Sequence, residues 1–398
     1  MPKLSIAYIS FDIVPAPKGA SIHIEAFSWA LAAAYGELYL VTVSPTENFI
    51  DSSQLHPNIK QIMLPALGDN LIQRVLHFRR LLQAWLQKRR CDIIHIRSIY
   101  EGLIIACNKN QYCDRLIFEV NGLPSVELKY RYPAVADDRE LLHKLHSQEQ
   151  ICLEAADLIV TPSIVTAKYL QRRGISERKI NVIPNGVDLE VFTYKKNQHF
   201  NIDGVDSPYQ MLYFGTLSSW QGVNLAIEAL GLINRDFTAC LTVIGQARDY
   251  QIKNLKQLAY KLGVLDKLSI LEPMPQQDLV AHIHTSDVIL APLTANDRNL
   301  IQGCCPLKIL EGMATGTPVI TSDIPVVQEL GENGVHFLSV KPGSAKAIKD
   351  AVLQLRNDQE FVTQLTANAR KRIEEHYTWQ LAGEALVNGY RGQLTVDS

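Results

Sequence analysis

The sequence of 398 residues predicts an α/β protein with two domains, each built on a doubly wound parallel sheet. Short runs rich in β-branched and aromatic residues alternate with longer helix-like segments along the chain. The alternation breaks at a polar stretch, residues 192–210, and then restarts. The length also fits two domains of ordinary size.

The first domain is predicted to span residues 1–195. Residues 4–10 are typical of a buried strand, residues 21–36 of a helix ending at Gly36, and residues 37–43 of the next strand. Together they make one βαβ unit. Further strands are expected at QIMLP, CDIIHIR, RLIFEV, DLIVTPS and KINVIP.

The second domain is predicted to span residues 205–377. Its strands are expected at MLYFGTL, CLTVIG, KLSILEP, DVILAPL, PVITSD and VHFLSV. The chain then ends in helical segments whose amphipathic pattern is interrupted at Tyr377 and Trp379. Because parallel sheets bind ligands outside the carboxyl ends of their strands, two such domains are expected to face one interdomain crevice.

Composition excludes several classes of protein. With 39 basic and 41 acidic residues there is no positive excess, so nucleic acid is not expected as a partner. The N-terminal MPKLSIAYISF leads directly into a strand, and no later run approaches the roughly 18 apolar residues of a membrane span, so we expect a cytoplasmic protein. Seven cysteines without C-x-x-C spacing indicate reduced thiols rather than disulfides or a zinc site.

The segment QGCCPLKILEGMATGTPVITSD, residues 302–323, places one carboxylate, Glu311, inside an apolar helix. Such a carboxylate is costly unless something binds it. Pro306 suits the first helical position and Gly316 the end of the helix. The first-turn N–H groups would attract a diphosphate, and the oxygens of Glu311 suit the vicinal hydroxyls of a ribose. Lys308 either adds charge to this phosphate site or is a solvated lysine.

Other loops follow strand ends and carry weaker signals. Gly19 and Ala20 would let the backbone approach a ligand before a helix capped by Ser21, and His23 follows in the first turn. Glu119 and Asn121 end a strand, and Gly215 leads through a polar loop to a helix near Gly222. For these residues, packing and turn formation remain alternatives to ligand contact.

The sequence resembles the retaining glycosyltransferases of family 4 over nearly its whole length. VIPNGVDLEVF, residues 182–192, is similar to the interdomain signature of that family, and residues 306–323 are similar to the second half of its E-x7-E donor motif. The resemblance implies a GT-B fold of two Rossmann-like domains facing an interdomain crevice. It also implies that a final helix, about 378–398, packs back on the first, acceptor-side domain, while the second domain binds the donor.

The resemblance assigns roles to individual residues. It implies that Glu311 binds the ribose, that the loop from Gly303 to Leu307 holds sugar and phosphate through its backbone, and that Asn121, Lys308 and Glu311 are the catalytic candidates. The donor-binding set is Gly215, Thr216, Gln221, Arg298, Gly303, Cys304, Cys305, Pro306, Leu307, Lys308 and Glu311. The acceptor-side set is Gly19, Ala20, His23, Glu119 and Asn121.

Four positions depart from the family pattern. Gly303 stands where the first motif glutamate would contact the donor sugar, and Asn121 stands where many members have a histidine. Thr216 and Gln221 occupy the places of an arginine and a lysine that usually bind the diphosphate. The missing positive charge would then come from Lys308, Arg298 or Arg248.

The predicted function is transfer of a sugar from a nucleotide diphosphate sugar to a glycan, a lipid-linked or a small-molecule acceptor, with retention and without a cofactor or metal. Alternatives are a nucleotide-sugar epimerase or hydrolase of the same fold, and a non-catalytic donor-binding partner subunit.

Residues 71–92 form an amphipathic helix candidate that suits peripheral contact with the inner face of an anionic membrane, or else a core-packed helix with a solvated basic face. Its basic residues are Arg74, Arg79, Arg80, Lys88, Arg89 and Arg90.

Overall fold

The computed structural model describes residues 4–52, 56–196 and 207–394. The chain divides into two compact units. Unit 1 comprises residues 1–184, 302–304 and 379–398, and unit 2 comprises residues 185–301 and 305–378. Of the polar stretch predicted to link the domains, residues 197–206 lie outside the described part of the chain.

Unit 1 contains an eight-stranded sheet in the order β3-β4-β2-β1-β5-β6-β7-β8. All pairs are parallel except β3 with β4. Every predicted strand of this region is confirmed. The three-residue antiparallel edge strand β3 was not predicted. The strands are β1 (Ile6–Ile13), β2 (Leu38–Val43), β3 (Ile50–Ser52), β4 (Ile59–Leu64), β5 (Cys91–Ile96), β6 (Cys113–Glu119), β7 (Leu158–Thr161) and β8 (Ile180–Val182).

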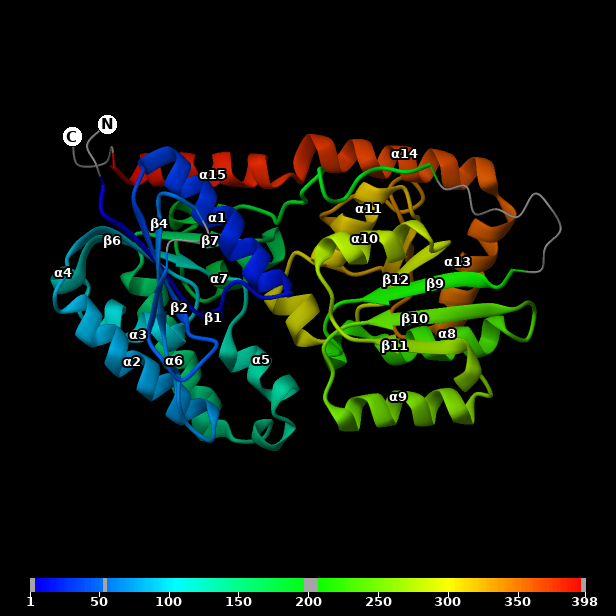
Figure 1. The fold of residues 1–398 in the computed structure, drawn as a ribbon, viewed down its shortest axis with the longest axis horizontal. Helices are drawn as coiled ribbons and strands as arrows, with labels where there is room; N and C mark the ends of the chain where they lie inside the picture. The colour runs from blue at the N-terminus through cyan, green and yellow to red at the C-terminus, as the bar shows by residue number, and fades with distance from the viewer. Residues whose placement is uncertain (1–3, 53–55, 197–206, 395–398) are drawn as a thin grey trace. The chain divides into compact units, whose positions relative to one another are not determined.

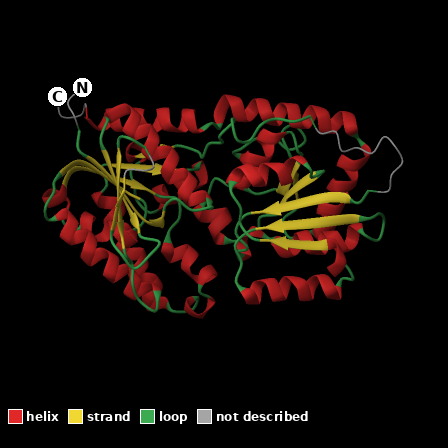
Figure 2. Cartoon of the chain, viewed as in Figure 1, coloured by secondary structure: helices red, strands yellow, loops and turns green. Residues whose placement is uncertain are grey.

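Helices cover both faces of this sheet, as Figure 2 shows. Because side chains alternate along a strand, Ile6 and Tyr8 face α1 and α15, while Ala7 and Ile9 join the core under α2, α3 and α6. The helices are α1 (Gly19–Tyr35), α2 (Leu71–Leu86), α3 (Ile99–Ala106), α4 (Lys109–Tyr112), α5 (Pro124–Arg131), α6 (Arg139–Ala155), α7 (Ile164–Arg172) and α15 (Trp379–Leu394).

The final helix α15 packs along α1, and the two run side by side in Figure 1. Gly383 allows this approach, since a Cβ there would lie 2.7 Å from Cβ of Ala30. The predicted interruption of the terminal helical pattern is confirmed, because α14 ends at His376 and α15 begins at Trp379. The C-terminal segment therefore completes the core of unit 1.

Unit 2 contains a six-stranded parallel sheet in the order β11-β10-β9-β12-β13-β14. Counted within the unit, this is the 3-2-1-4-5-6 order of a Rossmann sheet, whose ligands bind where the order reverses, here between β9 and β12. The six predicted strands are confirmed. They are β9 (Tyr209–Phe214), β10 (Ala239–Ile244), β11 (Leu268–Leu271), β12 (Val288–Ala291), β13 (Val319–Ser322) and β14 (Leu338–Val340).

The helices of unit 2 also lie on both faces of its sheet, with α8, α9 and α13 over one large apolar cluster. They are α8 (Val223–Ile233), α9 (Asp249–Lys261), α10 (Gln276–His284), α11 (Leu307–Thr315), α12 (Pro325–Gln328), α13 (Ala345–Asn357) and α14 (Gln359–His376). Among the described residues, no helix combines the length and apolar character needed to cross a bilayer.

Candidate active site

Glycine brings three loops of unit 2 together at the carboxyl edge of its sheet. Gly215 follows β9 with a φ of +116°. A Cβ on Gly222 would lie 1.8 Å from the carbonyl oxygen of Pro292, and one on Gly245 would lie 1.9 Å from that of Gly215. Since no side chain fits at these contacts, the loops after β9, β10 and β12 approach through their backbones.

Lys308 brings a positive charge to the end of β9. Its side chain rises from the first turn of α11 and is 6% exposed. The ammonium lies 4.0 Å from the centroid of the Tyr213 ring and 3.3 Å from the place of a Cβ on Gly215. A cation thus stands at the loop where Thr216 and Gln221 supply none.

Glu311 lies on the same helix and is 7% exposed. Its Oε1 accepts a hydrogen bond of 3.2 Å from Nε2 of Gln276, the first residue of α10. No hydrogen bond to Oε2 is found within the described part of the chain. Burial raises the pKa of Glu311 to about 7, against the lowering effects of Gln276 and Lys308. The carboxylate therefore has unused acceptor capacity.

The ends of α11 follow the sequence closely but not fully. Gly316 ends the helix in the left-handed region with a φ of 86°, as predicted. Pro306 is the residue before the helix rather than its first residue, since its ψ of 104° is extended. Gly312 lets the helix approach the sheet, because a Cβ there would lie 2.7 Å from Val319 and 2.8 Å from Ile289.

Gly303 cannot carry a side chain in this fold. Its φ is +87°, and a Cβ would lie 2.6 Å from Oγ1 of Thr166 and 2.7 Å from Oγ of Ser163. The neighbouring Gln302 is fully buried, accepts from the backbone N–H of Leu123 at 2.9 Å and donates to Glu127 at 2.9 Å. The packing of this loop therefore leaves no room for a glutamate at position 303.

The remaining predicted donor residues are spread over unit 2 and the loop. Cys304 and Cys305 are buried, and the carbonyl of Cys305 accepts a 2.7 Å hydrogen bond from Asn185. Arg298 lies 5.5 Å from the ring of Trp220. Thr216 is exposed, with its carbonyl bound by the Tyr213 hydroxyl at 2.7 Å. Leu307 begins α11, and Arg248 is exposed before α9.

In unit 1, five side chains converge on one carboxylate, Glu119, at the end of β6. Its Oε1 receives His23 at 2.9 Å, Arg97 at 2.8 Å and the amide of Asn121. Its Oε2 receives the Tyr8 hydroxyl at 2.6 Å and His95 at 3.1 Å. We call these six residues the Glu119 cluster.

The negative charge of Glu119 is balanced by side chains inside the protein. Glu119 is 1% exposed, and although burial would raise its pKa, His23 and Arg97 hold that pKa well below the usual value. Burial also lowers the pKa of His95. The carboxylate is therefore ionised and saturated with donors.

The cluster extends outward in two directions. The other ring nitrogen of His95 lies 2.8 Å from the Tyr390 hydroxyl of α15. Arg97 also contacts Asp12 at 3.1 Å, and Asp12 contacts Lys18 at 3.1 Å. Asp12 and Arg97 lie at the ends of β1 and β5, where the strand order of unit 1 reverses.

These positions refine the predicted acceptor side. His23 and Glu119 are buried and bind each other, so we assign them to the interior rather than to direct acceptor contact. Gly19 and Ala20 are the first, half-buried residues of α1. The prediction that Ser21 caps this helix is wrong, because Ser21 lies inside it, accepting from the N–H of Ala16 and donating to Glu25, each at 2.8 Å.

Sequence reasoning missed Tyr8, His95, Arg97, Asp12, Gln276 and Tyr390. Polar residues inside the buried runs LSIAYIS and CDIIHIR were a usable signal, because such a strand position needs a partner. No comparable signal marked Gln276 or Tyr390, which lie on helices with mixed composition.

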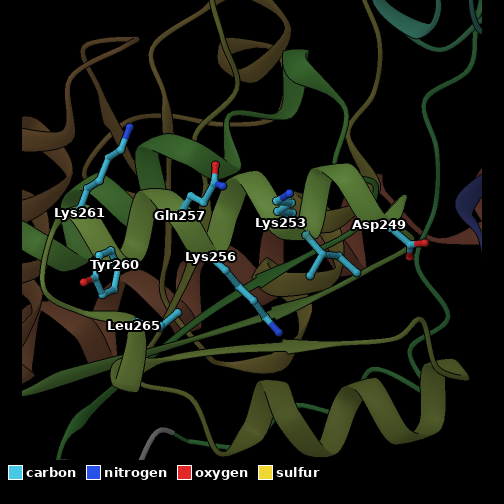
Figure 3. A pocket seen from close by; sticks show the side chains of 8 residues that line it. Asp249, Lys253, Lys256, Gln257, Tyr260, Lys261 and Leu265 are labelled. Carbon is cyan, nitrogen blue, oxygen red and sulfur yellow. The ribbon is translucent and has the colours of Figure 1, made fainter.

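A surface hollow of about 940 Å³ runs along α9 and the turn after it. Figure 3 shows Lys253, Lys256, Lys261 and Tyr260 around it. It includes none of the predicted donor residues.

Two family models match the chain. The model described as Glycosyltransferase Family 4 covers residues 17–191, and the model described as Glycosyl transferases group 1 covers residues 195–372. A glycosyltransferase of Methanocaldococcus jannaschii is 25% identical over 308 residues, 75% of this chain and 75% of that protein.

Solved structures share the fold. Sucrose-phosphate synthase from Thermosynechococcus elongatus superposes with a TM-score of 0.81 at 22% identity, over 99% of both chains. Anabaena HepE in complex with UDP and glucose superposes with a TM-score of 0.74 at 14% identity, over 98% of this chain and 100% of that one.

Proposed function

The chain is a glycosyltransferase of family 4, with the GT-B fold, and we propose that it transfers a sugar from a nucleotide diphosphate sugar to an acceptor hydroxyl with retention. The observation that carries the donor assignment is Glu311, a buried carboxylate with unused acceptor capacity at the ligand-binding edge of a Rossmann sheet. Binding of UDP by the neighbour HepE supports a nucleotide donor.

In this proposal unit 2 holds the nucleotide. The ribose hydroxyls donate to Glu311, and the diphosphate lies at the start of α11, where the helix dipole and the Lys308 ammonium meet its charge. The ammonium of Lys308 lies beside Gly215 at the end of β9, so it supplies the positive charge that Thr216 and Gln221 do not provide. Arg298 and the backbone from Gly303 to Leu307 complete the donor set.

The chemical step needs no protein nucleophile. The bond between the anomeric carbon and the phosphate oxygen breaks, and the acceptor oxygen bonds to the same face of that carbon. The acceptor proton passes to the departing phosphate. The protein contributes position and charge stabilisation, so we propose that neither a cofactor nor a metal takes part.

The test uses calorimetry with UDP, GDP and ADP, followed by turnover with the corresponding nucleotide sugars. Glu311→Gln should weaken binding of the preferred nucleotide by roughly 1–3 kcal/mol, because ribose hydroxyls lose an ionised acceptor. Turnover should persist with excess chelator. Unchanged affinity in the folded variant would refute the ribose assignment, and chelator-sensitive turnover restored by Mg²⁺ would refute the metal-free mechanism.

The same assay separates the alternatives. A transferase forms a glycoside only when acceptor is present, whereas a hydrolase releases free sugar and an epimerase changes the sugar while it remains nucleotide-linked. A non-catalytic subunit binds nucleotide without turnover.

The acceptor side is proposed to include Gly19, Ala20 and Asn121, which lie at the edge of unit 1.

We also propose a peripheral membrane contact through α2, which would suit a lipid-linked acceptor at the cytoplasmic face. Ile72 and Leu76 are 62% and 57% exposed and share one face with Arg80 by their i, i+4 spacing. Arg79 is instead bound to the carbonyls of Ile99 and Tyr100, each at 2.6 Å. We therefore expect lipid contact from Ile72, Leu76 and Arg80 and not from Arg79.

Sedimentation with anionic vesicles tests this contact. Wild type should co-sediment at low salt, and a variant with Ile72→Ser, Leu76→Ser and Arg80→Gln should not, since each engaged basic residue contributes about 1 kcal/mol. A control with Lys346→Gln, on α13, should behave as wild type. Equal recovery of all three proteins in the supernatant would favour a soluble acceptor.

A further inference from the structure

Gln276 is the polar side chain that α10 contributes to Glu311. It is the first residue of that helix, follows Pro275 and is half-buried. Its Nε2 donates to Oε1 of Glu311 at 3.2 Å, across from α10 to α11. The bond ties down one oxygen of the carboxylate and leaves Oε2 without a hydrogen-bond partner among the described residues.

In the part of the chain that the structure describes, the other groups around Glu311 make no hydrogen bond that would fix the orientation of its carboxylate. Lys308 lies one turn earlier on the same helix and acts on Glu311 through its charge. From α14, Arg370 reaches the far end of α11, at the carbonyl of Ala314, 3.0 Å away. Beneath the helix, β12 and β13 present Ile289 and Val319. Within the described residues, Gln276 is thus the side chain that hydrogen-bonds to this carboxylate.

We propose that Gln276 is a positioning residue for nucleotide binding: its amide orients the Glu311 carboxylate toward the ribose diol and favours the ionised form. This inference rests on the proposed ribose-binding role of Glu311. An ionised carboxylate accepts from both hydroxyls, whereas a protonated one loses acceptor capacity and makes weaker, neutral hydrogen bonds.

The electrostatics support a role in setting the working pH range. Burial raises the pKa of Glu311 to about 7, and the bond from Gln276 opposes that shift. Without the amide donor the pKa rises further, so a smaller fraction of Glu311 is ionised near neutral pH. Each further unit lowers the ionised fraction by up to about tenfold at pH values below the pKa.

The test compares two adjacent glutamines. Gln276→Met keeps the length of the side chain and removes the donor, while Gln277→Met makes the same change at an exposed residue one position along the helix. Binding of the nucleotide preferred by the wild type, among UDP, GDP and ADP, is measured by calorimetry from pH 6 to pH 9. Comparison at equal pH cancels the titration of the phosphates themselves.

We expect Gln276→Met to bind about tenfold more weakly than wild type at pH 6.5 and within about threefold at pH 9. Gln277→Met should stay within about twofold throughout. Gln276→Lys, which returns a donor with positive charge, should restore binding at low pH. Circular dichroism confirms that each variant is folded.

The outcomes separate this inference from the function on which it rests. If Glu311→Gln weakens binding but Gln276→Met matches Gln277→Met at every pH, the positioning role is overturned and the donor site stands. A loss for Gln276→Met that is equal at every pH overturns the effect on ionisation and leaves only the orienting role of the amide. If Glu311→Gln has no effect, or no nucleotide binds the wild type, both fall together.

Discussion

Glu119 and Glu311 are both buried carboxylates near the carboxyl edge of a parallel sheet, one in each unit, yet they are in opposite states. Glu119 has five donors and a pKa well below the usual value. Glu311 has one side-chain donor and a pKa raised to about 7. Burial acts on both, so the difference comes from the charges of His23 and Arg97 beside Glu119, together with its additional hydrogen bonds.

This difference indicates which carboxylate is available to a ligand. A saturated carboxylate such as Glu119 has no capacity left and holds β1, β5, β6 and α1 together. A buried carboxylate with unused acceptor capacity, such as Glu311, destabilises the protein, and a ligand that donates hydrogen bonds to it can offset this cost. The charges and donors around these two buried carboxylates thus distinguish a structural role from a binding role where burial alone does not.

The largest expected effect is the loss of stability in Glu119→Gln. Removing this charge leaves Arg97 buried with Asp12 as its one anionic partner among the described residues, and unpairing a buried charge costs about 3–5 kcal/mol. Trp29, Trp85 and Trp379 belong to unit 1 and Trp220 to unit 2, so urea unfolding followed by fluorescence in a Trp220→Phe background reports unit 1. A change below about 1 kcal/mol would contradict the structural role.

The second prediction concerns Glu311→Gln without ligand. Because folding raises the pKa of Glu311 from 4.5 to about 7, ionisation opposes folding, and wild-type stability falls as pH rises through that window. Below about pH 4.5 the two proteins should be similar, and above pH 7 the variant should be more stable by up to about 3 kcal/mol. Hydrogen exchange of α11 peptides, compared at equal pH, measures this. Slower exchange in wild type at pH 8 would show that Glu311 is not strained.

The smallest effect is expected at the rim of the Glu119 cluster, in Tyr390→Phe. It removes the hydroxyl that pairs with His95 and should cost about 1–2 kcal/mol in the same unit 1 unfolding assay. Tyr35→Phe is the matched control, because the hydroxyl of Tyr35 in α1 also binds α15, through a longer, 3.3 Å bond to the carbonyl of Val387, and Tyr35 is only half-buried. Equal effects of the two substitutions would show that the bond between Tyr390 and His95 adds nothing to the stability of the Glu119 cluster.

Much of the fold was predictable because its signals are local. Alternating strand and helix patterns gave all the parallel strands, and glycines such as Gly316 gave helix ends through their positive φ. The antiparallel β3 was not predicted, because a strand of three residues is too short to show a pattern. Helix starts were less certain, and Ser21 shows why: its hydroxyl can bond inside a helix as well as cap one.

The candidate site was predictable only where one residue conflicts with its neighbours. Glu311 and Lys308 are polar in an apolar helix, and that conflict identified them. Of the Glu119 cluster, His23, Glu119 and Asn121 were predicted singly, as possible acceptor contacts. The cluster itself was not predicted, because no local pattern connects these residues with their partners on distant strands. Gln276 is ordinary in its own helix, and its importance comes from a contact 35 residues away.

The closed space at Gly303 also constrains how this chain can change by mutation. A glutamate there would need a left-handed backbone and a side chain where Ser163 and Thr166 already stand. Substitutions at these three positions are therefore expected to be coupled, and a glutamate at position 303 is expected to require changes at Ser163 or Thr166 as well. We expect variants that carry a glutamate at this position to need a remodelled start of α7, where Ser163 and Thr166 lie.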